Sequence, residues 1–230
     1  PMFPDAFFPS AIPIFPLPLV LFPGQIKQLR IFEPRYQVML SDCLEDDAPF
    51  GIVLAKTSRA GESESLPHRI GTLAHITQVD PLPDDTFQIQ IYGGERFSIQ
   101  DFVDDAPYLQ ANIESHPLLH TTSRGTDELE QRVRLLLSEY LDALTKASGM
   151  RFNIHTIPSD PLQLAYLAAV VLQTNNEKKQ TMLACTQLPR LFIQEINLLT
   201  SELDLMAWIN ATITDTQDSG FGSDNWLSLN

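Results

Sequence analysis

The chain has 230 residues, enough to bury a substantial hydrophobic core without disulfide bonds, and its two cysteines, Cys43 and Cys185, lie far apart and in no CxxC motif. A formal net charge of -14 argues against sequence-independent binding to nucleic acid, because a phosphate backbone requires a surface rich in Lys and Arg. No stretch approaches the ~20 apolar residues of a membrane span and no secretory signal is recognisable, so we expect a cytoplasmic protein with reduced thiols and no membrane partner.

The first half of the chain, residues 1–120, is predicted to be rich in β-strands. Apolar and polar residues alternate in Phe87-Gln88-Ile89-Gln90-Ile91, the period of a strand with one buried face. Turn residues separate the predicted strands, at Phe22-Pro23-Gly24, at residues 81–85 and at Gly93-Gly94. Short strands joined by such turns predict a small curled sheet or barrel.

One helix is expected to interrupt these strands. Pro34 stands where the first turn of a helix tolerates proline. Apolar residues then recur at helical spacing, at Tyr36, Met39, Leu40, Cys43 and Leu44. We expect this helix to lie across the sheet, with Cys43 in the contact.

The second half, residues 121–209, is predicted to be a helical bundle because the apolar period changes to 3.6 residues. Thr126 is expected to cap the first of its helices. Further helices are expected to start at Ser159-Asp160-Pro161, near Asn176 and at Gln187 to Pro189.

The last segment, residues 210–230, is expected to be a flexible tail. After Trp208 the composition turns to Thr, Asp, Ser, Gly and Asn, with few aliphatic side chains to bury.

Several motifs along the first half resemble those of one known family. They are Pro13-Ile14-Phe15-Pro16-Leu17-Pro18, Phe22-Pro23-Gly24, Arg30-Ile31-Phe32-Glu33-Pro34-Arg35-Tyr36, Phe50-Gly51-Ile52-Val53-Leu54 and Gly94-Glu95-Arg96-Phe97. Together they resemble the amino-terminal substrate-recognition domain of Lon proteases. The resemblance implies an α+β fold, in which a β-rich PUA-like pseudo-barrel over residues 1–120 precedes a helical bundle over residues 121–209.

Two features depart from the family pattern. The chain has Asp84-Asp85 where the family hairpin usually has Asp-Gly, so a different type of turn is expected there. It also lacks the Gly-x-x-x-x-Gly-Lys-Ser/Thr loop and the Ser/Lys peptidase that follow in a full Lon protease. We therefore expect a stand-alone, non-enzymatic member of the family.

The function that the resemblance implies is recognition of unfolded or extended polypeptides, as an adaptor, a chaperone-like holder or a regulator of a separate ATP-dependent protease. We expect the binding surface in the groove between sheet and bundle, rimmed by Arg30, Arg35 and Arg96. The other candidate binding residues are Glu33, Tyr36, Phe50 and Phe97. The alternative is binding of a small molecule or a modified side chain in a pocket at the mouth of the barrel, which an aromatic cage would favour.

The candidate arginines have a second interpretation, which we favour. Arg35 and Arg96 could present their guanidinium forks to a peptide carboxylate, or they could pair with Glu33 and Glu95 and fix the first helix against the sheet. The structural role fits their places at strand and helix junctions.

Neither a metal site nor another cofactor is expected. Of the five histidines, the one close pair, His116 and His120, is split by Pro117, which works against ligation from one helical face. Cys43 and Cys185 are better explained as packed side chains than as nucleophiles.

Overall fold

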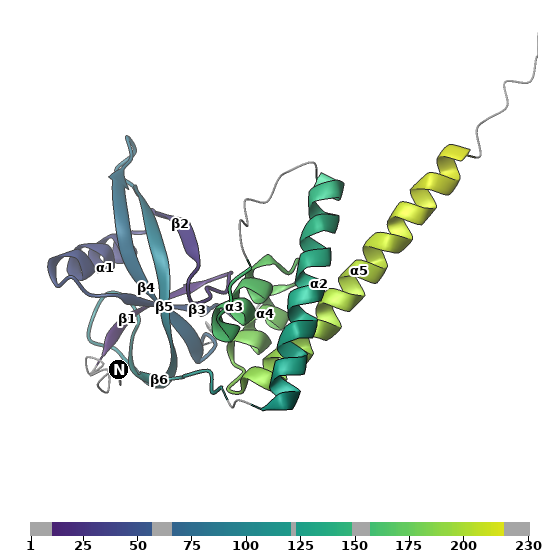
Figure 1. The fold of residues 1–230 in the computed structure, drawn as a ribbon. Coiled ribbons are helices and arrows are strands. Elements are labelled where there is room, and N and C mark those ends of the chain that lie inside the picture. The colour runs from purple at the N-terminus through teal and green to yellow at the C-terminus, as the bar shows by residue number, and fades with distance from the viewer. Residues whose placement is uncertain (1–10, 57–65, 121–122, 149–156, 219–230) are drawn as a thin grey trace, which may run out of the picture.

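The computed structural model describes residues 11–56, 66–120, 123–148 and 157–218, the last nine of these by their backbone alone (Figure 1). A β-barrel carrying one helix lies beside a bundle of four helices. The strands are β1 (Ile12–Leu17), β2 (Ile26–Ile31), β3 (Phe50–Leu54), β4 (Ile70–Pro81), β5 (Phe87–Val103) and β6 (Gln110–Ser115). The helices are α1 (Pro34–Glu45), α2 (Arg124–Ser148), α3 (Pro161–Val171), α4 (Asn176–Leu183) and α5 (Leu188–Asp218). The predicted α+β class is confirmed.

The sheet closes on itself through its longest strand, β5. The strand order is β2-β5-β4-β3-β1-β6, with an additional pairing between β5 and β6. One side of β5 pairs with β4, and the other side pairs first with β2 and then with β6. Among the six described strands, β1 and β3 are the one pair that runs parallel. This arrangement leaves β2 as an edge strand attached to the barrel.

Glycines shape the turn that leads into β2. Gly24 has a φ of +81°, in the left-handed region that glycine adopts without strain. At Gly93 an added Cβ would lie 2.3 Å from the carbonyl oxygen of Phe22. The sequence predicted a turn at Gly93-Gly94, but both residues lie inside β5, where glycine admits the close approach of a neighbouring backbone.

The turn between β4 and β5 forms without glycine. Asp85 itself takes the left-handed conformation, with a φ of 58°. Aspartate tolerates this region better than most residues with a side chain.

Helix α1 begins at Pro34 and packs on the sheet as predicted. Its buried residues are Tyr36, Met39, Leu40 and Cys43, whereas Leu44, predicted for the same face, is exposed. Burial, and then the nearby carboxylates of Asp42 and Asp46, raise the pKa of the Cys43 thiol to about 12. The Cys43 side chain is therefore a neutral core residue at neutral pH.

The bundle helices begin close to the predicted positions. Helix α2 starts at Arg124, and Ser123 rather than Thr126 caps it, because the Thr126 amide donates to Ser123 Oγ at 3.2 Å. Asp160 caps α3 and Asn175 caps α4, each by accepting a hydrogen bond from a backbone amide three residues later.

Helix α5 is longer than the sequence predicted. It continues past Trp208 to Asp218 and projects beyond the other helices (Figure 1). Residues 219–230, the rest of the predicted tail, lie outside the described residues.

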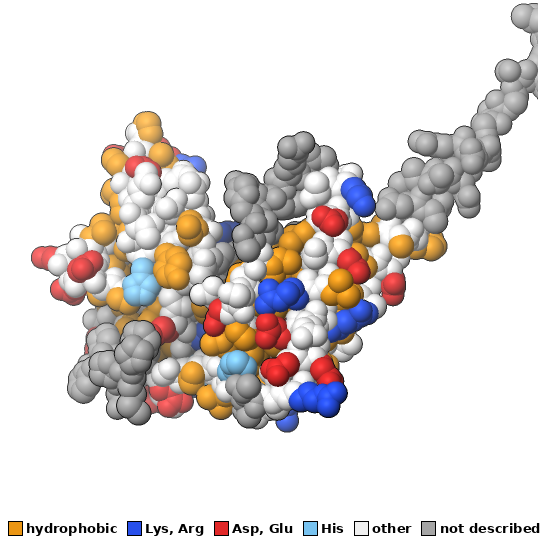
Figure 2. Space-filling model, in the orientation of Figure 1, with side chains coloured by type: hydrophobic (Ala, Val, Ile, Leu, Met, Phe, Trp, Pro, Cys, Tyr) orange, Lys and Arg blue, Asp and Glu red, His pale blue; other side chains and the backbone are white. Residues whose placement is uncertain are grey.

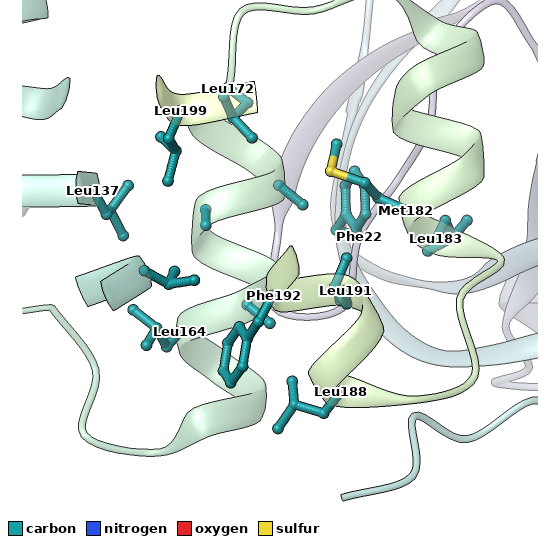
Figure 3. Close-up of a cluster of buried hydrophobic side chains, with 14 of the residues drawn as sticks. Phe22, Leu137, Leu164, Leu172, Met182, Leu183, Leu188, Leu191, Phe192 and Leu199 are labelled. Carbon is teal, nitrogen blue, oxygen red and sulfur yellow. The ribbon is translucent and has the colours of Figure 1, made fainter. Parts of the chain in front are cut away.

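The barrel and the bundle share one hydrophobic core. Val20, Phe22 and Leu54 of the barrel belong to the same buried cluster as residues from all four helices of the bundle. Figure 3 shows Phe22 beside Met182 of α4 and Leu191 of α5. Because neither half buries these side chains alone, we expect the two halves to unfold together.

One carboxyl group is buried within the bundle. The side chain of Glu195, on α5, has no exposed surface, and neither of its oxygens has a hydrogen-bond partner among the described residues. Burial raises the pKa of this carboxyl well above its usual range, because the ionised form would lose its hydration.

Replacing Glu195 by Gln should stabilise the fold at pH 7. The unfolded carboxyl ionises above about pH 4.3 whereas the folded one retains its proton, so the wild type loses stability as pH rises from there through the folded pKa. Glutamine cannot ionise, and the variant should gain about 1 kcal/mol or more at pH 7, since one pKa unit corresponds to about 1.4 kcal/mol. Urea unfolding at pH 4 and pH 7 measures this gain, with Glu139→Gln on the exposed face of α2 as the control. An equal effect of Glu195→Gln at both pH values would contradict a buried, protonated carboxyl.

Candidate functional site

A groove of about 610 Å³ separates the turn before β2 from helix α3. One wall consists of Pro23, Gly24 and Gln25 with Tyr92 of β5, and the other is α3 with the residues that precede it. The second wall comprises Pro158, Asp160, Leu162, Gln163, Tyr166, Leu167 and Val170. Figure 2 shows hydrophobic side chains on both the barrel and the bundle where the two meet. The walls are therefore largely apolar, with a few polar groups between them.

Backbone hydrogen bonds hold the barrel wall in place. The Gly24 amide donates to Gly93 O and the Gly93 amide donates to Gln25 O, both at 2.8 Å. The Gln25 side chain in turn accepts from the Phe22 amide at 3.1 Å. The turn that forms this wall is thus anchored to β5, next to Tyr92.

Helix α3, which forms the second wall, is unusually apolar. Leu164, Ala165, Ala168 and Ala169 are buried against the bundle. The opposite side of α3 still carries Leu162, Tyr166, Leu167 and Val170, which line the groove. A helix that is apolar all round needs cover on every side, and here the groove leaves one side partly open.

A buried arginine joins the barrel to the end of helix α4. Arg96 of β5 is 3% exposed, and its Nη1 donates to Leu183 O at 2.5 Å and to Cys185 O at 2.7 Å. His116 Nε2 lies 3.1 Å from Ala184 O. The carbonyls of Leu183 and Ala184 end helix α4 and that of Cys185 follows directly, so a positive charge is favourable here because the C-terminal end of the helix dipole is negative.

The same guanidinium reaches the α3 wall of the groove. Arg96 Cζ lies 5.9 Å from the ring centroid of Tyr166. Burial lowers the pKa of Arg96, yet arginine remains protonated at neutral pH. Its Nε and Nη2 have no partner among the described residues. Arg96 therefore positions α4 and the Tyr166 ring from within the molecule and does not face solvent.

Further polar contacts join the barrel to the bundle. Gln180 Nε2 donates to Ile70 O at 3.0 Å, and Asn176 Nδ2 donates to Pro18 O at 2.7 Å. Leu119 bridges the start of α5, with its amide donating to Thr186 O and its carbonyl accepting from the Leu188 amide. With the shared core, these contacts form the groove before any ligand arrives.

The structure separates the residues that the sequence placed around this groove. Arg96 is inside the molecule and pairs with backbone carbonyls, so the pairing with Glu95 considered from sequence is wrong. Phe50 and Phe97 have no exposed surface and belong to different parts of the barrel core. None of these three side chains rims the groove.

The remaining sequence candidates line a second cleft, of about 760 Å³, along β1 and the start of α1. Arg30, Glu33, Arg35 and Tyr36 all contribute to it. Arg35 Nη2 lies 2.8 Å from Glu33 Oε2, which confirms the structural pairing that the sequence favoured. Arg30 pairs with Asp84 of the β4–β5 turn, a contact not predicted.

Sequence reasoning missed the groove-lining residues Tyr92, Leu162, Tyr166, Leu167 and Val170. One signal was available, since the run from Pro161 to Val171 holds almost no polar residue, more than a one-sided helix requires. The position of Tyr92 opposite this helix depends on tertiary structure alone.

The described parts of the chain contain neither a candidate metal cluster nor a membrane-spanning helix. No group of three or more His, Cys, Asp or Glu side chains there could hold a metal ion. None of the helices there is long and apolar enough to cross a membrane.

Comparison with known proteins gives one consistent result. Residues 11–201 match the family model of the ATP-dependent protease La (LON) substrate-binding domain. The chain is 25% identical over 210 residues to Lon protease 2 of Myxococcus xanthus, covering 88% of this chain and 25% of that protein. It is 29% identical over 150 residues to the Lon protease of Cytophaga hutchinsonii, covering 64% of this chain and 18% of that protein.

Solved structures share the fold. The N-terminal domain of the Mycobacterium avium complex Lon protease superposes with a TM-score of 0.66 at 14% identity, over 83% of this chain and 98% of that one. The Lon N-terminal domain protein from Xanthomonas campestris gives 0.58 at 21% identity, over 80% of this chain and 96% of that one.

Replacing Arg96 by Met should destabilise the whole fold. The substitution keeps most of the volume but leaves the carbonyls of Leu183 and Cys185 without their donor, a loss of about 2–4 kcal/mol. Arg30→Met is the matched control, because its exposed ion pair contributes only about 0–1 kcal/mol. Urea unfolding followed by circular dichroism compares the two. A midpoint for Arg96→Met equal to that of Arg30→Met would contradict the role assigned to Arg96.

Proposed function

Because this chain belongs to the family of Lon substrate-binding domains, we propose that it recognises extended segments of unfolded polypeptides in the groove between Tyr92 and helix α3. The observation that carries this proposal is the groove itself, an apolar trough whose two walls are fixed by Arg96 and the shared core. Preformed walls lower the cost of ordering the protein on binding.

The chemistry of the walls suits polypeptide rather than one defined ligand. Tyr92, Leu162 and Leu167 offer apolar contacts that are indifferent to exact sequence, and aromatic rings add area at a small entropic cost. Gln25, Asp160 and Gln163 supply polar groups that a peptide backbone could meet. An unfolded segment presents both kinds of surface, whereas a folded protein buries its apolar side chains.

We propose a non-enzymatic role as an adaptor, a chaperone-like holder or a regulator of proteolysis. The proposal requires no covalent chemistry from the protein, and Cys43 is held as a neutral thiol inside the core. The relatives that share this domain are Lon proteases, and this chain spans about a quarter or less of the length of those compared above. We therefore propose an ATP-dependent protease as the partner that receives the bound polypeptide.

The second cleft fits the alternative, a small ligand or modified side chain, less well. An aromatic cage would require open rings, but the rings of Phe15 and Tyr36 pack on each other with centroids 4.2 Å apart. Tyr108 donates to Asp42 Oδ2 at 2.7 Å. Of the four aromatic residues that line this cleft, these three are at most 7% exposed, and Phe32, at 63%, is a single open ring rather than a cage. We therefore favour the groove beside α3.

The proposal is tested by removing apolar side chains from both walls. Tyr92 is 44% exposed and Leu162 is only partly buried, so the variant Tyr92→Ala with Leu162→Ala should remain folded, which urea unfolding checks. The double variant should bind fluorescein-labelled, reduced and carboxymethylated α-lactalbumin at least about tenfold more weakly, the equivalent of about 1.4 kcal/mol. Fluorescence anisotropy at physiological salt measures the affinity.

Leu135→Ala is the matched control. Leu135 is 51% exposed on α2 and does not line the groove, so its loss should leave the affinity unchanged. Equal affinities for the wild type, the double variant and the control would remove the groove from the proposal. No binding by the wild type would remove polypeptide recognition itself.

A further inference from the structure

We infer that the free edge of β2 accepts the bound peptide as an additional strand, and that the preferred peptide carries carboxylates. This inference rests on the proposed function and specifies how the groove would hold its polypeptide. It follows from the alternation of backbone hydrogen bonds along β2, from the position of this strand at the groove, and from the positive charge of two nearby lysines.

The pairing of β2 with β5 shows which backbone amides and carbonyls of β2 face away from the sheet. The Gly93 amide donates to Gln25 O, and the register then pairs Lys27 with Ile91 and Leu29 with Ile89. In an antiparallel ladder, alternate residues bond to the partner strand. Ile26, Gln28 and Arg30 therefore direct their amides and carbonyls away from β5.

No second strand occupies this edge within the described part of the chain. β2 pairs with β5 alone, and it stands at the end of the strand order. Three outward amides and three outward carbonyls form a template for strand addition, a mode in which backbone hydrogen bonds supply affinity without demanding a particular sequence. Such tolerance is what recognition of diverse unfolded segments requires.

The edge is continuous with the groove. β2 begins directly after Pro23, Gly24 and Gln25, which form the barrel wall, and its first residue, Ile26, is 63% exposed. On the other side, Lys179 Nζ donates to the carbonyl of Val170, a residue of the α3 wall. A strand added to β2 would therefore place one row of its side chains toward the groove.

The positive charge of two lysines beside the groove indicates which peptides bind best. Lys27 is exposed on β2, Lys179 reaches the groove through its contact with Val170, and neither ammonium forms an ion pair with a carboxylate among the described residues. The chain as a whole has 29 acidic residues against 15 basic ones, so two lysines beside the groove without acidic partners are notable, one on β2 and one on α4. A lysine on an edge strand also opposes pairing of that strand with the same strand of another copy of the protein. A peptide with carboxylates supplies the negative charge that these two lysines lack.

Proline at position 28 is the direct test. Gln28→Pro removes one outward amide and blocks an added strand, while the ladder to β5 stays intact because the Gln28 amide does not face it. Gln28→Ala is the matched control, since it loses the same side chain but keeps the amide. The probes are fluorescein-labelled decapeptides in which Val alternates with Ser, with two serines replaced by Glu or by Lys.

We expect three results. The wild type and Gln28→Ala bind the Glu peptide at least tenfold more tightly than Gln28→Pro does. The Glu peptide binds the wild type at least fivefold more tightly than the Lys peptide, and Lys27→Gln reduces this preference to less than twofold. Hydrogen exchange by NMR shows the amides of Ile26, Gln28 and Arg30 slowed at least tenfold by the Glu peptide, while those of Lys27, Leu29 and Ile31 are already slow.

The failures of the two proposals are distinguishable. If carboxymethylated α-lactalbumin binds but Gln28→Pro behaves as Gln28→Ala and the three amides exchange as in the free protein, strand addition is wrong and groove recognition stands. If strand addition holds but the Lys peptide binds as well as the Glu peptide, the charge preference is wrong. If the wild type binds neither α-lactalbumin nor a decapeptide, both proposals fall.

Discussion

The attachment of Arg96 to the end of helix α4 is the constraint on which the rest of the structure depends. A strand of the barrel and a helix of the bundle, 87 residues apart in sequence, are joined by a buried cation and backbone carbonyls. A buried guanidinium without acceptors would cost several kcal/mol, so the two halves are favoured only in this arrangement. The shared cluster around Phe22 and Leu191 then fills the space that this contact sets. The groove beside α3 is a consequence of the resulting fixed separation.

This constraint explains how an open apolar surface persists. Side chains such as Leu162 and Leu167 would be covered if the barrel could move closer to the bundle, because burial of apolar surface is favourable. The Arg96 contact, the Gln180 and Asn176 hydrogen bonds and the Leu119 bridge oppose such movement. A rigid trough next to the outer edge of β2, which no described strand occupies, would offer an extended chain the two proposed modes of binding, one through side chains and one through backbone.

The sequence predicted most of the fold because its signals are local. Proline at the first turn of α1, the cap at Asp160 with Pro161 just inside α3, and the alternation along β5 each act over a few residues, and each is confirmed by the structure. Helix α2 shows the usual limit, since its start moved from Thr126 to the neighbouring cap Ser123. The turn predicted at Gly93 and Gly94 was wrong because glycine is also favoured within strands where another backbone approaches closely.

The candidate site was less predictable because it is formed by distant parts of the chain. Arginines in family-like motifs suggested a charged rim, but sequence could not show that Arg96 is buried against α4 or that Arg30 and Arg35 line another cleft. Tyr92 and α3 meet only in the folded protein. The apolar excess in α3 was the one available clue, and it indicated that the helix is covered on more than one side without identifying what covers it.

The most direct test of this view is an amide chemical-shift map of the protein titrated with carboxymethylated α-lactalbumin. We expect the perturbed amides to fall on both walls at the same titration points, around Gly24 and Tyr92 on the barrel and from Leu162 to Val170 on α3. Perturbations confined to one wall, or centred on Arg35 and Tyr36 in the second cleft, would contradict a binding groove formed by the fixed approach of barrel and bundle.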